Sequence, residues 1–532
     1  MHSLRVLDVT LRDGGCVNDF NFGQEYMQRI LAAQEASGLD IIELGYLDEK
    51  HGSLSGRTQY LDEQAVSRCL LRHKQPGTEY VVMMDYGKFH PEKLHRRTEG
   101  SIDGIRVAFH KKNARDIPDV AGEIISKGYN LYLQPMITLR YSDSELLELI
   151  AIVNRKLPDI SGFYIVDSFG EMRPNDMNRI MNLVDHNLDP AITLGFHSHN
   201  NLQMSYSNAC SMLSFPTNRD IILDSSIMGM GKGAGNLNTE LLLEHLNLFY
   251  GKSYNIPPLL EVMDEVINQI HSEHYWGYGV EYYLSSVNHC TPSYASHFYN
   301  KHMLSVDRVG ELLSMIDEDK KISFDREYAE QLYRKYNEAV IVDDSITVDD
   351  LKKEFEGRTV LLAAPGKGLS EAKDWIKALN SQENIVSVSM NTVLAPEYDY
   401  VFAGRSDIFL RALAEKRKII APSSVREAAE SMRENVKVLN YSRWIEVDES
   451  THDTSLVFVM KLLKFCGADE ILLAGFDGFS MNINDNYFDP NMRRPVNAEE
   501  AERRNSYNRS FIRKMREAGM LIRFLTPSKY DE

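Results

Sequence analysis

Short apolar runs alternate with longer amphipathic stretches through the first 250 residues of the chain. Near-continuous apolar runs are typical of strands buried on both faces of a parallel sheet, and the stretches between them have helical spacing, as at 25–37 and 144–156. The predicted strands are 4–8, 40–45, 80–85, 104–109, 130–135, 162–167, 192–197 and 220–225. Eight β/α units predict a closed (β/α)₈ TIM barrel, with an open doubly wound sheet as the alternative.

A second alternation of strands and helices begins near Thr359. We predict a Rossmann-like α/β domain over residues 351–532, joined to a barrel domain over 1–290 by a helical connector over 291–350. An aromatic cluster at 275–283 either packs the barrel against the next segment of the chain or contacts substrate. The charged stretch 497–517 predicts a solvated helix. The predicted strands of the second domain are 360–364, 385–390, 400–403, 418–421, 436–439, 470–474 and 521–525.

Polar residues lie at the ends of the predicted barrel strands. Active sites of barrel enzymes assemble from the C-terminal ends of the strands, so these side chains are expected to converge. They are Arg12, Asp13, Glu43, Asp85, Arg106, His110, Gln134, Asp167, Ser168, His197, His199 and, in the loop after the last strand, Asn236.

His197 and His199 are the most informative pair among them. Alternate residues of a strand project to the same side, so the two imidazoles stand together at a strand end. Two neutral imidazoles are half of a divalent metal site, which a carboxylate would complete. Asp13, in the Arg-Asp-Gly turn after the first strand, is the best candidate.

Composition limits the class of protein. The 532 residues are 43% hydrophobic and 26% charged, with a net charge of −18, which argues against general binding to nucleic acid or anionic membranes. No apolar run of membrane-spanning length appears, and the N-terminus lacks the form of a signal peptide. The five cysteines are scattered, without a Cys-x-x-Cys pair. We predict a cytoplasmic homo-oligomeric enzyme without nucleic-acid or membrane partners.

A glycine-rich turn follows the first strand of the second domain. Gly366, Lys367 and Gly368 join that strand to a predicted helix, whose free N–H groups could hold a phosphate. Asp477 ends another strand and could accept from ribose hydroxyls. A nucleotide or nucleotide-sugar site is therefore one interpretation. The other is that the glycines merely permit a tight turn and Asp477 caps the next segment.

Four motifs together resemble one enzyme superfamily. Arg12-Asp13-Gly14, Asp167-Ser168, His197-x-His199-Asn200 and Gly233-Ala234-Gly235-Asn236 are similar to motifs of metal-dependent aldolase and Claisen-type barrels. That superfamily includes 4-hydroxy-2-oxovalerate aldolase, 3-hydroxy-3-methylglutaryl-CoA lyase and isopropylmalate synthase, and the resemblance is strongest to the pyruvate-aldolase branch. It covers residues 4–290. The C-terminal half more distantly resembles sialyltransferase-like Rossmann domains.

The resemblance implies a role for each matching residue. Asp13, His197 and His199 would hold Mn²⁺ or Mg²⁺, with Asn236 as a further ligand. Arg12 would stabilise an enolate oxygen, and Ser168, with Gln134 at the neighbouring strand end, would bind the 2-oxo acid. The metal, as a Lewis acid, and the guanidinium would then share the stabilisation of the enolate charge.

One position departs from the aldolases. They carry a histidine base where this chain has Cys16, and a neutral thiol is a poor base near pH 7. We therefore predict that Cys16 is not the base, and we consider Glu43, His110 and Tyr282 as candidates.

The leading functional hypothesis is aldol chemistry between a pyruvate-type enolate and an aldehyde, with a nucleotide-linked or phosphorylated sugar as one possible substrate and polysaccharide biosynthesis as the setting. The alternatives are an acyl-CoA-dependent Claisen synthase, a bifunctional protein with a glycosyltransferase-like C-terminal domain, and a metal-bound scaffold without activity.

Overall fold

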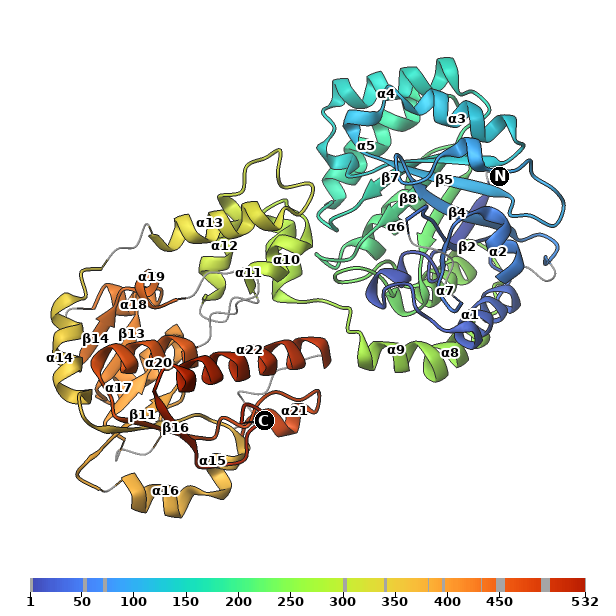
Figure 1. Ribbon diagram of the computed structural model, residues 1–532. Coiled ribbons are helices and arrows are strands. Elements are labelled where there is room, and N and C mark those ends of the chain that lie inside the picture. The colour runs from blue at the N-terminus through green and yellow to red at the C-terminus, as the bar shows by residue number, and fades with distance from the viewer. Residues whose placement is uncertain are drawn as a thin grey trace. The chain divides into compact units, whose positions relative to one another are not determined.

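The computed structural model divides into two compact units, residues 1–292 and 293–532, which are described separately (Figure 1). It describes residues 3–50, 55–69, 74–299, 304–338, 342–380, 382–394, 398–431, 433–445, 455–488 and 498–531.

The first unit contains a closed parallel barrel, which confirms the predicted TIM barrel. The strand order begins with β1 beside β9 and runs round to β2. The ring closes because β1 pairs in parallel with β2 as well as with β9. The predicted strands are found within about two residues at each end. They are β1 (Leu4–Asp8), β2 (Ile41–Leu47), β4 (Glu79–Asp85), β5 (Gly104–Phe109), β6 (Asn130–Pro135), β7 (Gly162–Asp167), β8 (Thr193–Ser198) and β9 (Ile221–Ser225).

Side chains alternate between two apolar clusters along the strands. One set, such as Val6 and Val82, packs outward against the surrounding helices, and the other, such as Leu7 and Val81, fills the barrel interior together with Tyr132. The helices between the strands are α1 (Gln24–Ala36), α2 (Glu63–Cys69), α3 (Ile117–Ser126), α4 (Asp143–Lys156), α5 (Pro174–Asn187), α6 (Ser205–Ser214) and α7 (Thr239–Phe249).

A short strand beside β2 was not predicted. β3 (Gln59–Tyr60) pairs in parallel with the end of β2, beyond a register shift between Glu43 and Tyr46. Two residues carry too little periodicity to predict a strand.

The region after the barrel is helical, as predicted. The aromatic cluster divides: Trp276 is buried in the barrel core and its Nε1 donates to the Met228 carbonyl at 3.1 Å, whereas Tyr275 and Tyr278 are exposed. The helices are α8 (Pro257–Val262), a π-helical turn (Met263–Ile267), α9 (Asn268–Glu273), α10 (Val280–Val287), α11 (Pro292–Tyr299), α12 (Val306–Ser314), α13 (Arg326–Glu338) and α14 (Ser345–Phe355).

The second unit contains a seven-stranded parallel sheet in the order β14-β13-β12-β11-β10-β15-β16. The direction of strand addition reverses between β10 and β15, so right-handed crossovers place helices on both faces. The strands are β10 (Thr359–Ala363), β11 (Ile385–Met390), β12 (Tyr400–Phe402), β13 (Ile419–Pro422), β14 (Val436–Leu439), β15 (Glu470–Ala474) and β16 (Leu521–Phe524).

The helices of this unit follow that topology. Helices α15 to α18 lie between β10 and β14 in sequence. Helix α20 leads from β14 to β15 and α22 leads from β15 to β16, and these two helices contact each other. The predicted charged helix is α22, although residue 497 lies outside the described residues. The helices are α15 (Lys367–Glu371), α16 (Lys373–Asn380), α17 (Ser406–Ala414), α18 (Arg426–Ala429), α19 (Tyr441–Trp444), α20 (Ser455–Cys466), α21 (Ile483–Asn486) and α22 (Ala498–Glu517).

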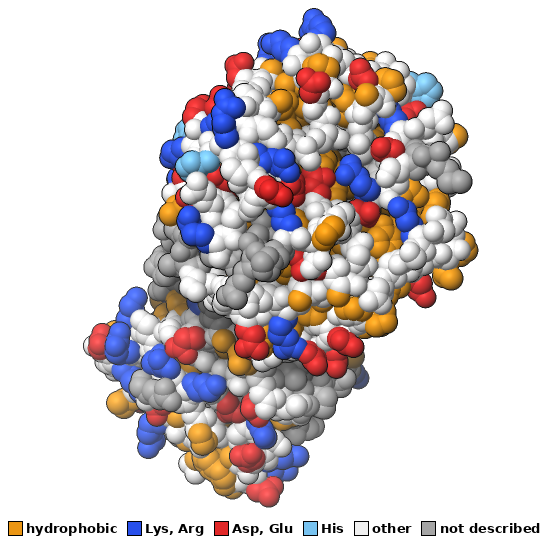
Figure 2. Space-filling view, turned by 90° about the vertical axis from the view of Figure 1, so that its right-hand side faces the viewer, with side chains coloured by type: hydrophobic (Ala, Val, Ile, Leu, Met, Phe, Trp, Pro, Cys, Tyr) orange, Lys and Arg blue, Asp and Glu red, His pale blue; other side chains and the backbone are white. Residues whose placement is uncertain are grey.

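Surface charge is mixed on the face drawn in Figure 2, where acidic and basic side chains are interspersed. Among the described residues, every helix is too short or too polar to cross a lipid bilayer.

Candidate active site

The loop after β1 carries the first site residues. The backbone N–H groups of Arg12 and Asp13 both donate to the Val9 carbonyl, at 3.0 and 2.8 Å, so the chain turns sharply as it leaves the barrel. Thr10 fixes the turn from below, because its hydroxyl oxygen accepts from the Ile227 N–H at 2.9 Å. Asp13 is 4% exposed and lies at the barrel mouth.

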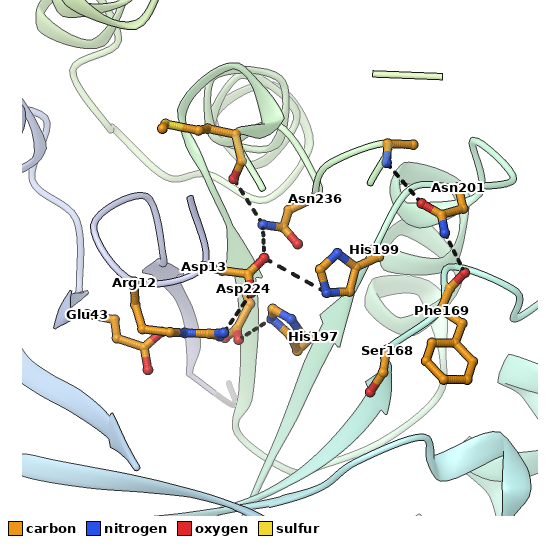
Figure 3. Close-up of polar contacts among 12 residues, drawn as sticks. Arg12, Asp13, Glu43, Ser168, Phe169, His197, His199, Asn201, Asp224 and Asn236 are labelled. Atoms are coloured by element: carbon orange, nitrogen blue, oxygen red, sulfur yellow. Dashed lines mark hydrogen bonds and ion pairs between the residues drawn. The ribbon is translucent and has the colours of Figure 1, made fainter. Parts of the chain in front are cut away.

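The two histidines come from the end of β8, which β9 separates from β1 in the barrel. His197 belongs to β8 and His199 follows it directly, and their rings stand edge to face with centroids 5.4 Å apart. The His199 N–H donates to the Asp167 carbonyl at 3.0 Å, which fixes the backbone next to β7. Both imidazoles point toward Asp13, as Figure 3 shows.

Asp13, His197 and His199 form a cluster that fits one metal ion. Their ligand atoms all lie within 4.8 Å of one another. Two atoms bound to one ion at about 2.0–2.4 Å can be no further apart than about 4.8 Å, so a shared ion satisfies this geometry. The predicted convergence of these side chains is therefore found.

Asn236 joins the cluster from the loop after β9. Its Nδ2 donates to Asp13 Oδ2 at 2.7 Å, and its buried Oδ1 has no hydrogen-bond partner among the described residues (Figure 3). A buried amide oxygen without a partner is costly unless a ligand or ion meets it. This orphaned oxygen, beside a carboxylate and two imidazoles, fits a divalent cation.

A buried series of ion pairs, on the barrel-interior side of the cluster, holds these groups in position. Asp224 Oδ2 accepts from His197 Nδ1 at 2.9 Å, which leaves Nε2 of His197 available for a metal. The Arg106 guanidinium, fully buried, pairs with both Asp224 and Glu43. Glu43 Oε2 also accepts from Arg12 Nε at 2.7 Å, so the series links Arg12 to His197.

Asp224 and the bridging role of Arg106 were missed by sequence reasoning. Arg106 was noted only as a polar residue on a strand, and Asp224 only as part of a predicted strand. The available signal was a charged residue inside each otherwise apolar strand, since a buried charge needs a partner.

Burial and neighbouring charges set the protonation of the cluster. Burial lowers the pKa of His199 to about 4, against the opposing effect of Asp13, so the imidazole is neutral near pH 7. Burial alone would raise the pKa of Asp13, but Arg12 and the two histidines hold it well below its usual range. A carboxylate and a neutral imidazole are the forms that bind metals.

The predicted substrate-binding residues lie at adjacent strand ends. Gln134, at the end of β6, is 2% exposed, and its Nε2 has no hydrogen-bond partner among the described residues. Ser168 Oγ, after β7, accepts from the Ile137 N–H at 3.1 Å and keeps its own proton to donate. Both side chains could therefore donate to an acid.

Tyr282 is held beside the barrel mouth by helix α10. Ser286 on this helix donates to the Phe169 carbonyl at 2.7 Å, and Asn201 Nδ2 donates to the same carbonyl at 2.9 Å. Burial and the adjacent Glu281 raise the pKa of Tyr282 to about 12, so its phenol stays protonated. Tyr282 is thus suited to giving a proton rather than taking one.

Comparison with known proteins agrees with this geometry. Residues 107–254 match the HMGL-like family model. A 4-hydroxy-2-oxovalerate aldolase of Comamonas testosteroni is 29% identical over 249 residues, covering 45% of this chain and 67% of that protein. Another, from Bacillus thuringiensis (strain Al Hakam), is 27% identical over 277 residues, covering 50% of this chain and 76% of that protein. The N-terminal barrel is thus similar to HMGL-like proteins and to 4-hydroxy-2-oxovalerate aldolases.

Among solved structures, the N-terminal domain of a proposed aldolase from Bacteroides vulgatus is 24% identical to this chain, with a TM-score of 0.49. The match covers 56% of this chain and 96% of that one.

The base candidates differ in their surroundings. Glu43 Oε2 is engaged by two guanidinium groups, which suits it to anchor Arg12 and Arg106. Burial lowers the pKa of His110, so it is a neutral imidazole, but no hydrogen bond or ion pair joins it to the cluster among the described residues. The surrounding protein and the nearby Asp13 raise the pKa of the Cys16 thiol, so it is neutral near pH 7.

The glycine-rich turn of the second unit corrects one prediction. Its backbone donors are not free: the Gly366 N–H donates to the Gly475 carbonyl at 3.0 Å, and the Gly368 N–H donates to Asp477 Oδ2 at 2.7 Å. A Cβ atom at Gly366 would lie 2.8 Å from Asp477 Cγ, so the glycine is required by this close approach. Lys367 begins a helix of only five residues and faces Asp485, with Nζ 3.8 Å from Oδ1. The predicted phosphate cradle is therefore filled by the chain's own carboxylate.

Proposed function

We propose that this protein is a divalent-metal-dependent carbon–carbon lyase or synthase that works through a pyruvate-type enolate and an aldehyde. The observation that carries this proposal is the placement of Arg12 beside the metal cluster. Its Nη1 donates to Asp13 Oδ1 at 2.7 Å while its Nε is held by Glu43, so a rigid cation adjoins the predicted metal site.

The residues of the mouth suit a 2-oxo acid. Mn²⁺ or Mg²⁺ bound at Asp13, His197, His199 and Asn236 would supply Lewis acidity to the carboxylate and keto oxygens. Arg12 would stabilise the negative charge that develops on the enolate oxygen. Gln134 Nε2 and the Ser168 hydroxyl would orient the carboxylate.

In the cleavage direction, a base takes the proton of the C4 hydroxyl and the C3–C4 bond breaks. The electron pair passes into the enolate, the aldehyde leaves, and C3 then takes up a proton. In the reverse direction the same group would return this proton to the aldehyde oxygen as the new bond forms, and the protonated Tyr282 would donate a hydrogen bond to that oxygen in both directions. His110 is our candidate for the base, since the Cys16 thiol is neutral.

Exchange of the C3 protons of pyruvate with deuterated solvent tests this function, because enolisation needs no aldehyde. We expect exchange by the Mn²⁺- or Mg²⁺-loaded protein, its loss in Asp13→Asn, and release of pyruvate from 4-hydroxy-2-oxo acids. No exchange by the wild-type protein with either metal would contradict the proposal. Release of free CoA from acyl-CoA without pyruvate exchange would instead favour the Claisen alternative, and inactivity with bound metal a scaffold.

A second candidate concerns residues 351–532, and we keep it because of the strand order. Gly366 and Asp477 follow β10 and β15, between which the order reverses, and open parallel sheets bind ligands at such a point. The buried Oδ1 of Asp477 has no hydrogen-bond partner among the described residues. We propose that it accepts from a hydroxyl of a nucleotide or nucleotide-sugar. Calorimetry of the full chain with nucleoside mono- and diphosphates tests this, and binding unaffected by Asp477→Ala would contradict it.

A further inference from the structure

The loop between β9 and α7 brings one cation, Lys232, to the mouth of the barrel. Lys232 is exposed, and no ion pair joins it to any described residue. Two other cations near the mouth are matched by carboxylates. Arg12 lies between Glu43 and Asp13, and Lys88 pairs with Asp85 at 2.8 Å. A lysine left without a carboxylate at the opening of a site is available to a ligand.

The two glycines that flank Lys232 fix its position. A Cβ atom at Gly231 would lie 2.9 Å from Asp13 Oδ2 and would collide with Asn236 Nδ2, so this backbone lies against the predicted metal ligands. A Cβ atom at Gly233 would lie 3.5 Å from Cδ1 of Tyr282. Lys232 therefore stands on the rim between the metal cluster and the phenol.

Hydrogen bonds hold this loop in place. The Asn236 N–H donates to the Gly229 carbonyl at 2.9 Å and the Gly235 N–H donates to the Lys232 carbonyl at 3.2 Å. Asn201 Oδ1 accepts from the Ala234 N–H at 3.0 Å, and the neighbouring Asn200 N–H donates to the Gly235 carbonyl at 2.8 Å. The backbone of Lys232 is thus fixed, and only its side chain has to adjust to a ligand.

The balance of charge leaves Lys232 unmatched. Arg12 and Arg106 are matched by Glu43 and Asp224. A divalent ion with Asp13 would retain one positive charge, which the carboxylate of a 2-oxo acid neutralises. Lys232 adds a further positive charge, which a neutral aldehyde would leave without a counter-charge.

We propose that Lys232 selects an aldehyde that carries its own anionic group, a carboxylate or a phosphate. This inference rests on the proposed aldol function and names the class of its second substrate. Lys232 is here a specificity-determining residue and takes no part in enolate formation, which we assign to Arg12 and the metal ligands.

The kinetic test compares anionic and neutral aldehydes with the Mn²⁺-loaded full chain. Succinic semialdehyde is paired with butanal, and glyceraldehyde 3-phosphate with glyceraldehyde, each in condensation with pyruvate. We expect at least one anionic aldehyde to be preferred, and Lys232→Gln to reduce that preference about three- to fivefold through KM, the scale of an exposed ion pair. Lys232→Arg should retain it.

Lys156→Gln is the matched control. Lys156 is exposed in the last turn of α4, at the opposite end of the barrel from the mouth, and its replacement changes the net charge equally. Neutral aldehydes should react equally well with wild type, Lys232→Gln and Lys156→Gln. No preference for either anionic aldehyde, or an equal loss with neutral aldehydes in Lys232→Gln, would overturn the inference. So would a fall in pyruvate exchange, which would place Lys232 on the enolate.

A binding measurement separates this inference from the proposed function. With oxalate added to occupy the metal, bound Mn²⁺ should enhance the ³¹P relaxation of inorganic phosphate in wild type and in Lys156→Gln, and clearly less in Lys232→Gln. Equal relaxation in all three proteins would overturn the inference even if the aldol activity is present. A specific loss in Lys232→Gln would support the anion site even if pyruvate exchange fails.

Discussion

The carboxyl ends of the two parallel sheets carry similar sequence signals but differ in what their polar groups do. At the barrel mouth, side chains from several strands hold one another and still leave inward-facing atoms without partners, such as Asn236 Oδ1 and Gln134 Nε2. Where the strand order of the second sheet reverses, the Asp477 carboxylate already accepts a hydrogen bond from the Gly368 N–H. The first arrangement leaves both a donor and an acceptor without partners among the described residues, whereas the second uses its backbone donors internally.

This difference shows what a motif does and does not specify. A glycine-rich turn fixes where backbone donors lie, but a ligand needs those donors to remain free. The turn at Gly366 keeps its shape because a carboxylate more than a hundred residues later fills it. The barrel motifs are more informative because three of them bring side chains to one cluster, which contains Asp13, His197, His199 and Asn236.

Removing a metal ligand should have the largest effect. In Asp13→Ala, both the carboxylate ligand and the partner of Arg12 and Asn236 are lost. We expect activity to fall by about 10³-fold or more and Mn²⁺ binding, measured by electron paramagnetic resonance, to be strongly weakened. Asp477→Ala should leave both unchanged. Similar losses in the two variants would contradict the contrast between the sheets.

Arg12→Ala tests the contribution of the oxyanion donor separately from that of the metal. We expect turnover and pyruvate exchange to fall by about 10²-fold or more, the scale of losing one oxyanion donor, while Mn²⁺ content stays nearly unchanged. Deuterium exchange followed by NMR measures the first and metal analysis the second. Unchanged exchange would remove Arg12 from the mechanism.

The buried series of ion pairs predicts a large cost for losing Arg106. Arg106→Met leaves Glu43 and Asp224 buried without their shared cation, and we expect a loss of about 3–5 kcal/mol in the free energy of unfolding. Mn²⁺ affinity should also fall by about 10- to 100-fold, because Asp224 no longer holds His197 firmly.

Arg5→Met provides the matched control for Arg106→Met. Arg5 pairs with Glu79 at 3.3 Å while its side chain is 28% exposed, so its loss should cost about 1 kcal/mol or less. Denaturant titration of the two variants measures both costs. Equal costs would mean that the buried series of ion pairs contributes nothing special.

Asp167 predicts a pH dependence of stability. Burial raises the pKa of Asp167 to about 7, although the N–H groups of Met172 and Glu171 donate to it. The folded protein therefore holds this proton more tightly than the unfolded chain, whose aspartate titrates near pH 4. The stability due to Asp167 is fully present below pH 4 and is lost as the pH rises through 7.

Denaturant titration between pH 5 and 8 measures this contribution. Asp167→Asn, which cannot titrate, should remove a slope of up to about 1.4 kcal/mol per pH unit from the stability profile. The difference in slope is the readout, since the substitution also changes hydrogen bonding. Identical slopes for wild type and variant would contradict the raised pKa.

Cys16→Ser should have the smallest effect. Because the thiol is neutral near pH 7, its replacement by a hydroxyl should change turnover by no more than about threefold. A loss as large as that of Arg12→Ala, with metal content intact, would instead make Cys16 the proton carrier.

Much of the barrel could be predicted because its strands are long apolar runs separated by helices of regular period. The clustering of Asp13, His197 and His199 could be predicted because the two histidines alternate at a strand end and Asp13 follows another strand. Arg106 and Asp224 were not recognised as partners, because their pairing depends on which strand ends meet across the barrel, 118 residues apart in sequence. The partner of the Gly366 turn lay equally far from any local signal.

The glycine-rich loop also bears on how this enzyme could change over evolutionary time. Any side chain at position 231 would displace Asp13 or break its 2.7 Å hydrogen bond with Asn236. Position 231 therefore accepts only glycine. The next position points outward and is fixed only through its backbone, so most residues can stand there without disturbing the fold. Residue 231 is thus fixed by its neighbours whereas residue 232 is open to substitution, so the proposed preference for anionic aldehydes could change there while the Asp13 cluster stays intact.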